Sequence, residues 1–278
     1  MRFLAVVRFT LEEAARRRVL LAMLLCGAAF LALYAVGFHF LVRDLAHEKG
    51  AMAALTRQFV MNMFTVAGLF ATNFLMVMSA VLLPVDTLSG EIASGVLQTV
   101  AARPLHRAEI VLGKWLGHLL VVWGYLLLLA SGVLAVAWLT THRVPPNVPA
   151  ALACLGLEAA VLVSLSIAGG ARLSTVTNGV LAFGMFGFAF LGGRVEEIGD
   201  VVHNVATRNI GTVSSLVMPT ESLWRLAAHL LQPPFLAQMR MSPFAMGPVP
   251  SALMVAWAGL WIVAALALAV RGFGKRPL

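Results

Sequence analysis

The sequence predicts an all-α integral membrane protein with six transmembrane helices and an N-terminal interfacial amphipathic helix. Of its 278 residues, 60% are hydrophobic and only 12% are charged, whereas a soluble domain averages about 45–50% apolar and about 25% charged residues. The apolar residues form segments that reach the ~20 residues a helix needs to cross a bilayer. The alternation at ~10-residue spacing that is typical of a β-barrel is missing from the sequence. These observations exclude a soluble enzyme, a disordered protein and a disulfide scaffold.

We expect residues 1–278 to form a single transmembrane domain, since no large hydrophilic domain interrupts the apolar segments. Six segments are long and apolar enough: residues 19–42, 59–84, 115–139, 150–171, 176–193 and 251–270. The fifth is the shortest and is rich in glycine. The two cysteines, Cys26 and Cys154, lie inside apolar segments, where we expect small buried hydrophobic residues and neither a disulfide nor a metal site.

Residues 1–18 are expected to form a helix that lies on the membrane surface before the first span. Apolar and charged side chains separate onto two faces, as in interfacial helices. The predicted apolar face carries Phe3, Leu4, Val6, Val7, Leu11 and Ala14, and the charged face carries Arg2, Arg8, Glu12, Glu13 and Arg16.

An even number of spans places both termini on the same side of the membrane. Basic residues are enriched in cytoplasmic tails and short loops, and with both termini in the cytoplasm, 12 of the 20 Lys and Arg residues lie on that side. We therefore interpret the formal net charge of +8 as a topology signal in the plasma membrane, the inner membrane of a bacterium, and not as a nucleic-acid site. The segment 194–250 is then extracytoplasmic, with amphipathic helices expected near 195–208 and 220–231 at the outer leaflet.

The sequence contains no energy source of its own. The phosphate-binding loop Gly-x-x-x-x-Gly-Lys-Ser/Thr has no match, because Gly113-Lys114 is preceded by Ala108 at the first glycine position and followed by Trp115. Ion-coupled carriers usually hold several ionisable groups within their spans, but Glu158 is the only carboxylate well inside one. We favour a structural carboxyl that pairs with Ser or backbone over a transport role. Any energy for transport must therefore come from another chain.

No catalytic residue, cofactor site or metal site is predicted. Met61 and Met63 resemble a copper-binding pair, as do Met76 and Met78, but helical residues two apart point about 200° away from each other. This argument does not apply to a third pair, Met239 and Met241, because these two residues lie in a proline-flanked loop and not in a helix. The abundant methionine is better explained as core filler.

The loop between the second and third spans, residues 86–114, is the strongest candidate for a partner site. Its apolar residues Ile92, Val96, Leu97 and Val100 recur at helical spacing, and Pro104 ends the helix because it disfavours helix at the preceding residue. A short helix parallel to the membrane, with Gln98, Arg103 and Arg107 exposed, can act as a lever for a docked partner. The alternative is a solvated loop whose basic residues only set the topology.

The same loop resembles the permease subunits of ABC transporters of type 2, in particular the branch that includes permeases for multicopper-enzyme maturation. The pattern Glu-x-x-x-Gly-x-Leu, then Pro-x-x-Arg, then Gly-Lys is carried by Glu91, Gly95, Leu97, Pro104, Arg107, Gly113 and Lys114. Val96 departs from the threonine that is common in the family. Residues 222–226 and 232–234 also resemble that branch.

The resemblance implies a six-span permease, as a homodimer or pseudo-dimer, bound to two copies of a separate ATPase that holds ATP and Mg²⁺. It implies that the 86–114 loop carries a coupling helix, and the transporter is expected to be an exporter. The expected coupling residues are Glu91, Gly95, Gln98, Arg103, Pro104, Arg107 and Glu109.

Polar and small residues in the spans allow two interpretations. Asn62, Thr65, Thr72 and Ser79 share one face of the second span, where they either line a translocation path or bond a neighbouring helix. Gly184 and Gly187 in the fifth span suit close helix packing or a dimer seam. Two other function classes stay open: a membrane-embedded enzyme that uses Glu158 and His118, and a non-transporting membrane anchor or sensor subunit.

Overall fold

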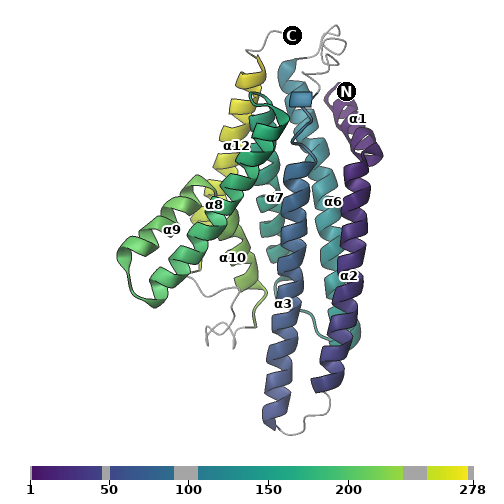
Figure 1. Cartoon of the computed structure of the whole chain (residues 1–278), viewed down its shortest axis with the longest axis vertical. Coiled ribbons are helices and arrows are strands. Elements are labelled where there is room, and N and C mark those ends of the chain that lie inside the picture. Colours follow the sequence, from purple (N-terminus) through teal and green to yellow (C-terminus); the bar gives the residue numbers. More distant parts are fainter. Residues whose placement is uncertain (1, 46–50, 91–105, 234–248, 275–278) are drawn as a thin grey trace.

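The computed structural model describes residues 2–45, 51–90, 106–233 and 249–274, and in these ranges the regular secondary structure is entirely helical (Figure 1). The described helices are α1 (Arg2–Arg16), α2 (Arg18–Leu45), α3 (Ala51–Leu82), α6 (Arg107–Thr141), α7 (Val148–Gly170), α8 (Thr175–Val201), α9 (Val205–Val217), α10 (Thr220–Leu230) and α12 (Ala252–Gly274).

Six of these helices are long and apolar enough to cross a membrane: α2, α3, α6, α7, α8 and α12. The shortest of them have 23 residues, which is about 35 Å of helix at 1.5 Å per residue and exceeds a hydrocarbon core of about 30 Å. The prediction of an all-helical fold with six spans is confirmed. The start of α1 and the end of α12 lie at the same end of the bundle (Figure 1).

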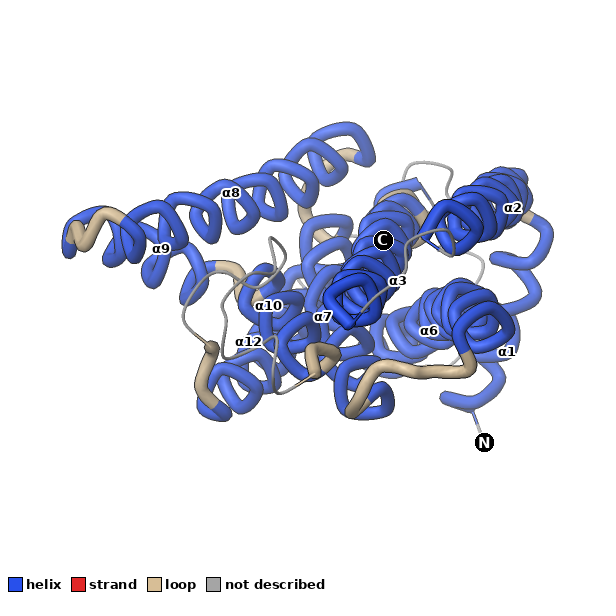
Figure 2. Tube along the Cα trace, turned by 90° about the horizontal axis from the view of Figure 1, so that it is seen from below, coloured by secondary structure: helices blue, strands red, loops and turns tan. Residues whose placement is uncertain are grey.

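Helix α7 forms the centre of the bundle. It contacts α3, α6, α8, α10 and α12, and 67% of its membrane window is buried, compared with 17% for α2 and 22% for α12. Seen along the bundle, α1 and α2 lie at one side and the α8–α9 pair at the other (Figure 2). Side chains on α7 are therefore the best shielded from the surroundings of the chain.

Helix α1 packs against α6 largely with the predicted apolar face, since Val7 and Ala14 of that face are buried, whereas Arg8 and Glu12 of the predicted charged face are exposed. Leu4 is 66% exposed and Phe9 is 62% exposed, whereas Thr10 is fully buried. Glu13, which the sequence placed on the charged outer face, instead turns towards α6 and pairs with Lys114. The predicted apolar face is therefore largely confirmed, and the prediction is wrong at Leu4 and Glu13, because α1 also pairs a polar group with α6 and leaves some large apolar side chains outward.

The prediction of a separate helix over 195–208 is also wrong. Helix α8 continues to Val201, and after a turn α9 begins at Val205 and runs back along α8. Glycines make this close pairing possible, because a Cβ atom on Gly192 would overlap Ser214 Oγ and one on Gly211 would lie 2.8 Å from the carbonyl oxygen of Gly192.

Helix α10 coincides with the helix predicted over 220–231, but its surroundings differ from the expectation. It packs against α7 and α8 within the bundle, and Leu223, Trp224 and Ala227 are almost completely buried. The other faces are buried as well, since Glu221 and Arg225 are 3% and 4% exposed. Helix α10 is therefore a packed element of the bundle and does not simply rest on a leaflet.

Candidate functional site

Helix α3 ends and helix α6 begins at the end of the bundle that carries the start of α1 and the end of α12 (Figure 1), so both flanks of the 86–114 loop lie there. Residues 91–105 lie outside the described residues, and with them the predicted short helix and five of the predicted coupling residues: Glu91, Gly95, Gln98, Arg103 and Pro104. The structure does describe both flanks of the loop, residues 83–90 after α3 and residues 106–114 at the start of α6. These flanks determine how the loop is connected to the helices.

The first flank is hydrogen-bonded to the start of α8. Thr175, the first residue of α8, donates its hydroxyl to Asp86 Oδ1 at 2.8 Å and lies 2.8 Å from Ser89 Oγ. Asn178, one turn further along, donates its amide to the carbonyl oxygens of Val85 (3.1 Å) and Ser166 (2.8 Å). The chain leaving α3 is thereby joined to α8, and through Ser166 to α7.

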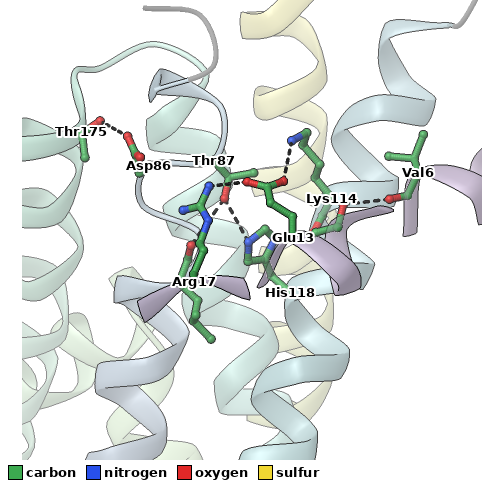
Figure 3. Close-up of polar contacts among 10 residues, drawn as sticks. Val6, Glu13, Arg17, Asp86, Thr87, Lys114, His118 and Thr175 are labelled. Atoms are coloured by element: carbon green, nitrogen blue, oxygen red, sulfur yellow. Dashed lines mark hydrogen bonds and ion pairs between the residues drawn. The ribbon is translucent and has the colours of Figure 1, made fainter. Parts of the chain in front are cut away.

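The same flank also bonds to α6 through a buried histidine (Figure 3). His118 Nε2 lies 3.0 Å from Thr87 Oγ1, and His118 Nδ1 lies 2.8 Å from the carbonyl oxygen of Lys114. Because a carbonyl oxygen only accepts, Nδ1 carries the proton, and in the neutral ring Nε2 is left to accept from the threonine hydroxyl. His118 is thus a connector between the loop and α6.

Helix α1 is joined to α6 by an ion cluster next to this histidine (Figure 3). Glu13 accepts a hydrogen bond from Arg17 at 2.5 Å, and its other oxygen lies 3.9 Å from Lys114 Nζ. Burial raises the pKa of Glu13, but the hydrogen bond from Arg17 and the positive charge of Lys114 outweigh it, so the pKa lies below its usual value. The carboxylate is therefore ionised near neutral pH.

Two glycines let α1 lie this close to α6. A Cβ atom on Gly113 would come within 2.7 Å of Val6 Cγ1, and one on Gly117 would come within 2.7 Å of Thr10 Cβ. Real Cβ atoms keep a larger separation, so these positions accept only glycine without a shift of α1. The sequence singled out Gly113 only as part of a motif, and the structure adds a packing reason for it.

The second flank is tied to the end of α12. Arg107, the first residue of α6, donates to the carbonyl oxygens of Phe273 (3.2 Å) and Gly274 (2.7 Å). These are among the last carbonyls of α12, which have no partner within their own helix. Glu109 accepts a hydrogen bond from the backbone N–H of His106 at 3.3 Å and so closes the first turn of α6. Arg107 and Glu109 are the two predicted coupling residues that lie in the described part of the chain.

We call this set of contacts the loop anchor, defined by Asp86, Thr87, Ser89, Arg107, Lys114 and His118 with their partners Glu13, Thr175 and the end of α12. The anchor connects both flanks of the loop to α1, α6, α8 and α12. Sequence reasoning missed Glu13, Thr175 and Asn178. The signal for Asn178 was a polar side chain in the first turn of a span, where it needs a partner.

The polar residues of α3 do not form one continuous lining. Asn62 and Thr65 line a cavity of about 670 Å³ at the end opposite to the termini, beside Arg57 and Arg143. Thr65 and Ser79 donate to carbonyl oxygens of their own helix, those of Met61 (2.9 Å) and Met76 (2.7 Å). Thr72 is fully buried. Both interpretations of this face, a path or helix packing, therefore remain predictions.

Glu158 lies at the centre of the bundle on α7 and is fully buried. It accepts one hydrogen bond, from the side-chain amide of Asn73 on α3 at 3.3 Å. Its other oxygen, Oε2, has no partner among the described residues. The predicted partners, Ser or backbone, are therefore wrong, and the carboxyl lines a cavity of about 190 Å³ instead.

A group of ion pairs next to this cavity joins α8 to α10. Arg194 pairs with Glu221, and with Glu197 at 2.8 Å, while Arg225 pairs with Glu196 at 2.6 Å. The sequence interpretation placed these charges in an outer segment, because an ion pair across 27 residues cannot be recognised from local spacing. The structure makes them a buried junction.

Gly184 and Gly187 do not create a close helix contact within the described part of this chain. A Cβ atom on either would meet nothing within 4 Å. The close contacts of α8 are made further along, at Gly192 and Gly193. A role of Gly184 and Gly187 in a dimer seam stays a prediction.

The two residues of the enzyme alternative do not share a site. His118 bonds Thr87 and Lys114 in the loop anchor, whereas Glu158 bonds Asn73 and lines a cavity to which no histidine of the described ranges contributes. Among the described residues, no three His, Cys, Asp or Glu side chains come together as a metal site would require.

Comparison with known proteins gives a match over nearly the whole chain. The family model described as ABC-2 family transporter protein matches residues 5–278. No curated protein matches the chain.

Proposed function

Because the chain belongs to the ABC-2 transporter family, we propose that this multi-pass membrane permease is the pore-forming part of an ATP-driven exporter. ATP would be hydrolysed on a separate chain, since the phosphate-binding loop has no match in this sequence. Two copies of such an ATPase would hold ATP and Mg²⁺, and this chain would hold neither.

The loop anchor is the observation that carries this proposal. Both flanks of the 86–114 loop are bonded to helices of the bundle, the first to α8 through Asp86 and Thr175 and the second to α12 through Arg107. A partner that moves the loop would therefore move several spans at once. A switch of this kind needs contacts that differ between two states of the bundle.

The coupling residues of this proposal fall into two groups. Glu91, Gly95, Gln98, Arg103 and Pro104 belong to the segment that would face the ATPase. Arg107 and Glu109 would hold the base of that segment, through the end of α12 and the first turn of α6. This division supports a lever model, in which contact residues and base residues have different roles.

The proposed topology places the loop and both termini in the cytoplasm, in the bacterial inner membrane. The distribution of Lys and Arg supports this orientation. A second copy of the permease would complete the translocation path, and the open surface around Gly184 and Gly187 on α8 supports a seam there. The narrower relation to permeases for multicopper-enzyme maturation also stays a prediction.

Co-purification tests the proposed function. A tagged copy of the chain, extracted gently from its own membrane, should bring with it a nucleotide-binding subunit, and the complex should hydrolyse ATP. The mass of the complex should correspond to two permeases and two ATPases. A chain that purifies alone and turns over a lipid or peptide by itself would instead support the enzyme alternative, and a chain with neither property would support the anchor or sensor alternative.

A further inference from the structure

The cavity that Glu158 lines is walled mainly by aromatic rings. Five rings face it, from α3, α8 and α10: Phe70, Phe74, Phe186, Phe190 and Trp224. Phe74 is 49% exposed, and Phe186 and Phe190 are partly exposed. The cavity is therefore closed at α7 and α10 and opens between α3 and α8.

Three polar side chains complete the lining, namely Asn73, Glu158 and Glu221. Among the described residues, no basic side chain lines this cavity. Glu221 already has an ion-pair partner, Arg194, which also pairs with Glu197. Glu158 has no cation paired with it in the described part, and its Oε2 is without a hydrogen bond. Of the two carboxyl groups that line the cavity, Glu158 is thus the one without an ion-pair partner in the described part of the chain.

An unmatched buried carboxylate is costly unless a cation or hydrogen-bond donor reaches it. Aromatic faces attract cations as well, most effectively where water is excluded. A carboxylate and five rings around one small space are therefore complementary to an organic cation. They are poorly complementary to an anion, which would meet carboxyl oxygen and the negative faces of the rings.

We propose that this cavity binds the cationic head of an organic ammonium compound, with Glu158 as its counter-ion and the aromatic rings as its walls. This assignment rests on the proposed transport function, because it names the class of cargo. The volume of about 190 Å³ is smaller than the roughly 300–1,000 Å³ of pockets that enclose a whole drug-sized ligand. The cavity therefore takes the charged head, and the rest of the molecule lies in the opening between α3 and α8.

The rings support an organic cation over a bare metal ion. Hard metal ions need about six oxygen ligands, and the described residues of the lining offer side-chain oxygen from three positions, one of which is committed to Arg194. Phe190 already accepts a cation on one side, since the Arg194 guanidinium carbon lies 5.4 Å from its ring centroid. Phe70 and Trp224 pack edge to face with centroids 5.0 Å apart, which fixes the inner wall.

Equilibrium binding of radiolabelled benzyltrimethylammonium to the purified full-length chain in lipid nanodiscs tests this site. We expect saturable binding that unlabelled benzyltrimethylammonium displaces and that benzenesulfonate, an anion of similar shape, does not. Glu158→Gln keeps the size and should weaken binding by about tenfold or more, because the charge is lost. Phe190→Leu should weaken it by about threefold or more. Glu12→Gln, on the exposed side of α1, is the matched control and should bind as the wild type does.

The assay separates this inference from the proposed function because it needs no ATPase. Saturable binding that is equal in the wild type and in Glu158→Gln would overturn the inference, and so would the absence of saturable binding. If Glu158→Gln unfolds, two other results still test the inference. Unchanged binding in Phe190→Leu, or displacement of the bound cation by benzenesulfonate, would overturn it. If the chain binds the cation but no ATPase co-purifies with it, the binding site is supported and the proposed transport function is overturned. A chain with its ATPase but without cation binding would do the reverse.

Discussion

Arg107 Nη1 donates a hydrogen bond to the carbonyl oxygen of Gly274 at 2.7 Å, so the first residue of α6 is joined to the last residue of α12 across 167 positions of sequence. Arg107 also closes the proposed coupling loop at its second flank. Movement of the loop at this flank is therefore transmitted directly to the last span.

Reversing the charge at this position should uncouple the permease from its ATPase. Arg107→Glu places a carboxylate against the carbonyl oxygens of Phe273 and Gly274, which repel it. We expect permease-dependent ATP hydrolysis in proteoliposomes to fall by about fivefold or more, as a coupling energy of this class implies. Membrane insertion should be normal. Arg208→Glu, on an exposed position of α9, is the control, and equal hydrolysis in the two variants would contradict the role of Arg107.

The contact between α1 and α6 should depend on glycine at position 117 and not at position 124. A Cβ atom on Gly117 would lie 2.7 Å from Thr10 Cβ, whereas one on Gly124 would meet nothing within 4 Å. Gly117→Ala should lower the free energy of unfolding by about 1–3 kcal/mol. Gly124→Ala should raise it by about 0.5–1 kcal/mol, because alanine favours helix. Denaturant titration of both variants measures the difference, and similar values for the two would argue against tight docking of α1.

Docking of α1 should also weaken in acid. The pKa of Glu13 is lowered in the folded chain, so this residue contributes stability above about pH 4.3, the ordinary value for glutamate in the unfolded chain. That stability is lost as the pH falls through the lowered folded-state pKa. The melting temperature of Glu13→Gln should therefore fall less than that of the wild type between pH 6 and pH 3. Glu12→Gln should behave as the wild type does, and the same acid sensitivity in all three chains would show that Glu13 is not responsible.

Helices α8 and α9 should separate if Gly192 is replaced by a residue with a side chain. A Cβ atom there would overlap Ser214 Oγ, whereas one on Gly184 of the same helix would meet nothing within 4 Å. Gly192→Ala should destabilise the chain by about 1–3 kcal/mol, and Gly184→Ala should leave the isolated chain as stable as before or slightly more stable. Protease cleavage within 202–217 reports the opening of this pair, and resistance of Gly192→Ala would contradict the packing.

Hydropathy predicted the six spans because a bilayer imposes a length and an apolar composition that few other environments require. The faces of the helices were harder to predict. On α1, Val7 and Ala14 of the predicted apolar face are buried, but Glu13 is also turned inward and Leu4 is turned outward, since a helix beside lipid has no general reason to hide every apolar side chain. Apolarity therefore identifies a membrane helix but gives the face it packs only in part.

The polar partners of the candidate site could be predicted only in part. Glu158 stood out as an isolated carboxylate in a span, but we interpreted it as a structural carboxyl that pairs with Ser or backbone. Its neighbours Asn73 and Glu221 come from α3 and α10, which local spacing cannot relate. Arg107 was recognised through the family pattern, but its bond to Gly274 depends on where α12 ends, and that is a property of the folded chain.

Site-directed cross-linking between this chain and its ATPase tests the central claim most directly. In a background with Cys26 and Cys154 replaced by alanine, single cysteines are placed at Gln98 in the 86–114 loop and at Arg143 in the connection between α6 and α7, at the opposite end of the bundle. The account predicts a cross-link to the ATPase subunit from position 98 and none from position 143. A cross-link from position 143 alone would reverse the topology, and the absence of any cross-link from position 98 in an active complex would contradict coupling through this loop.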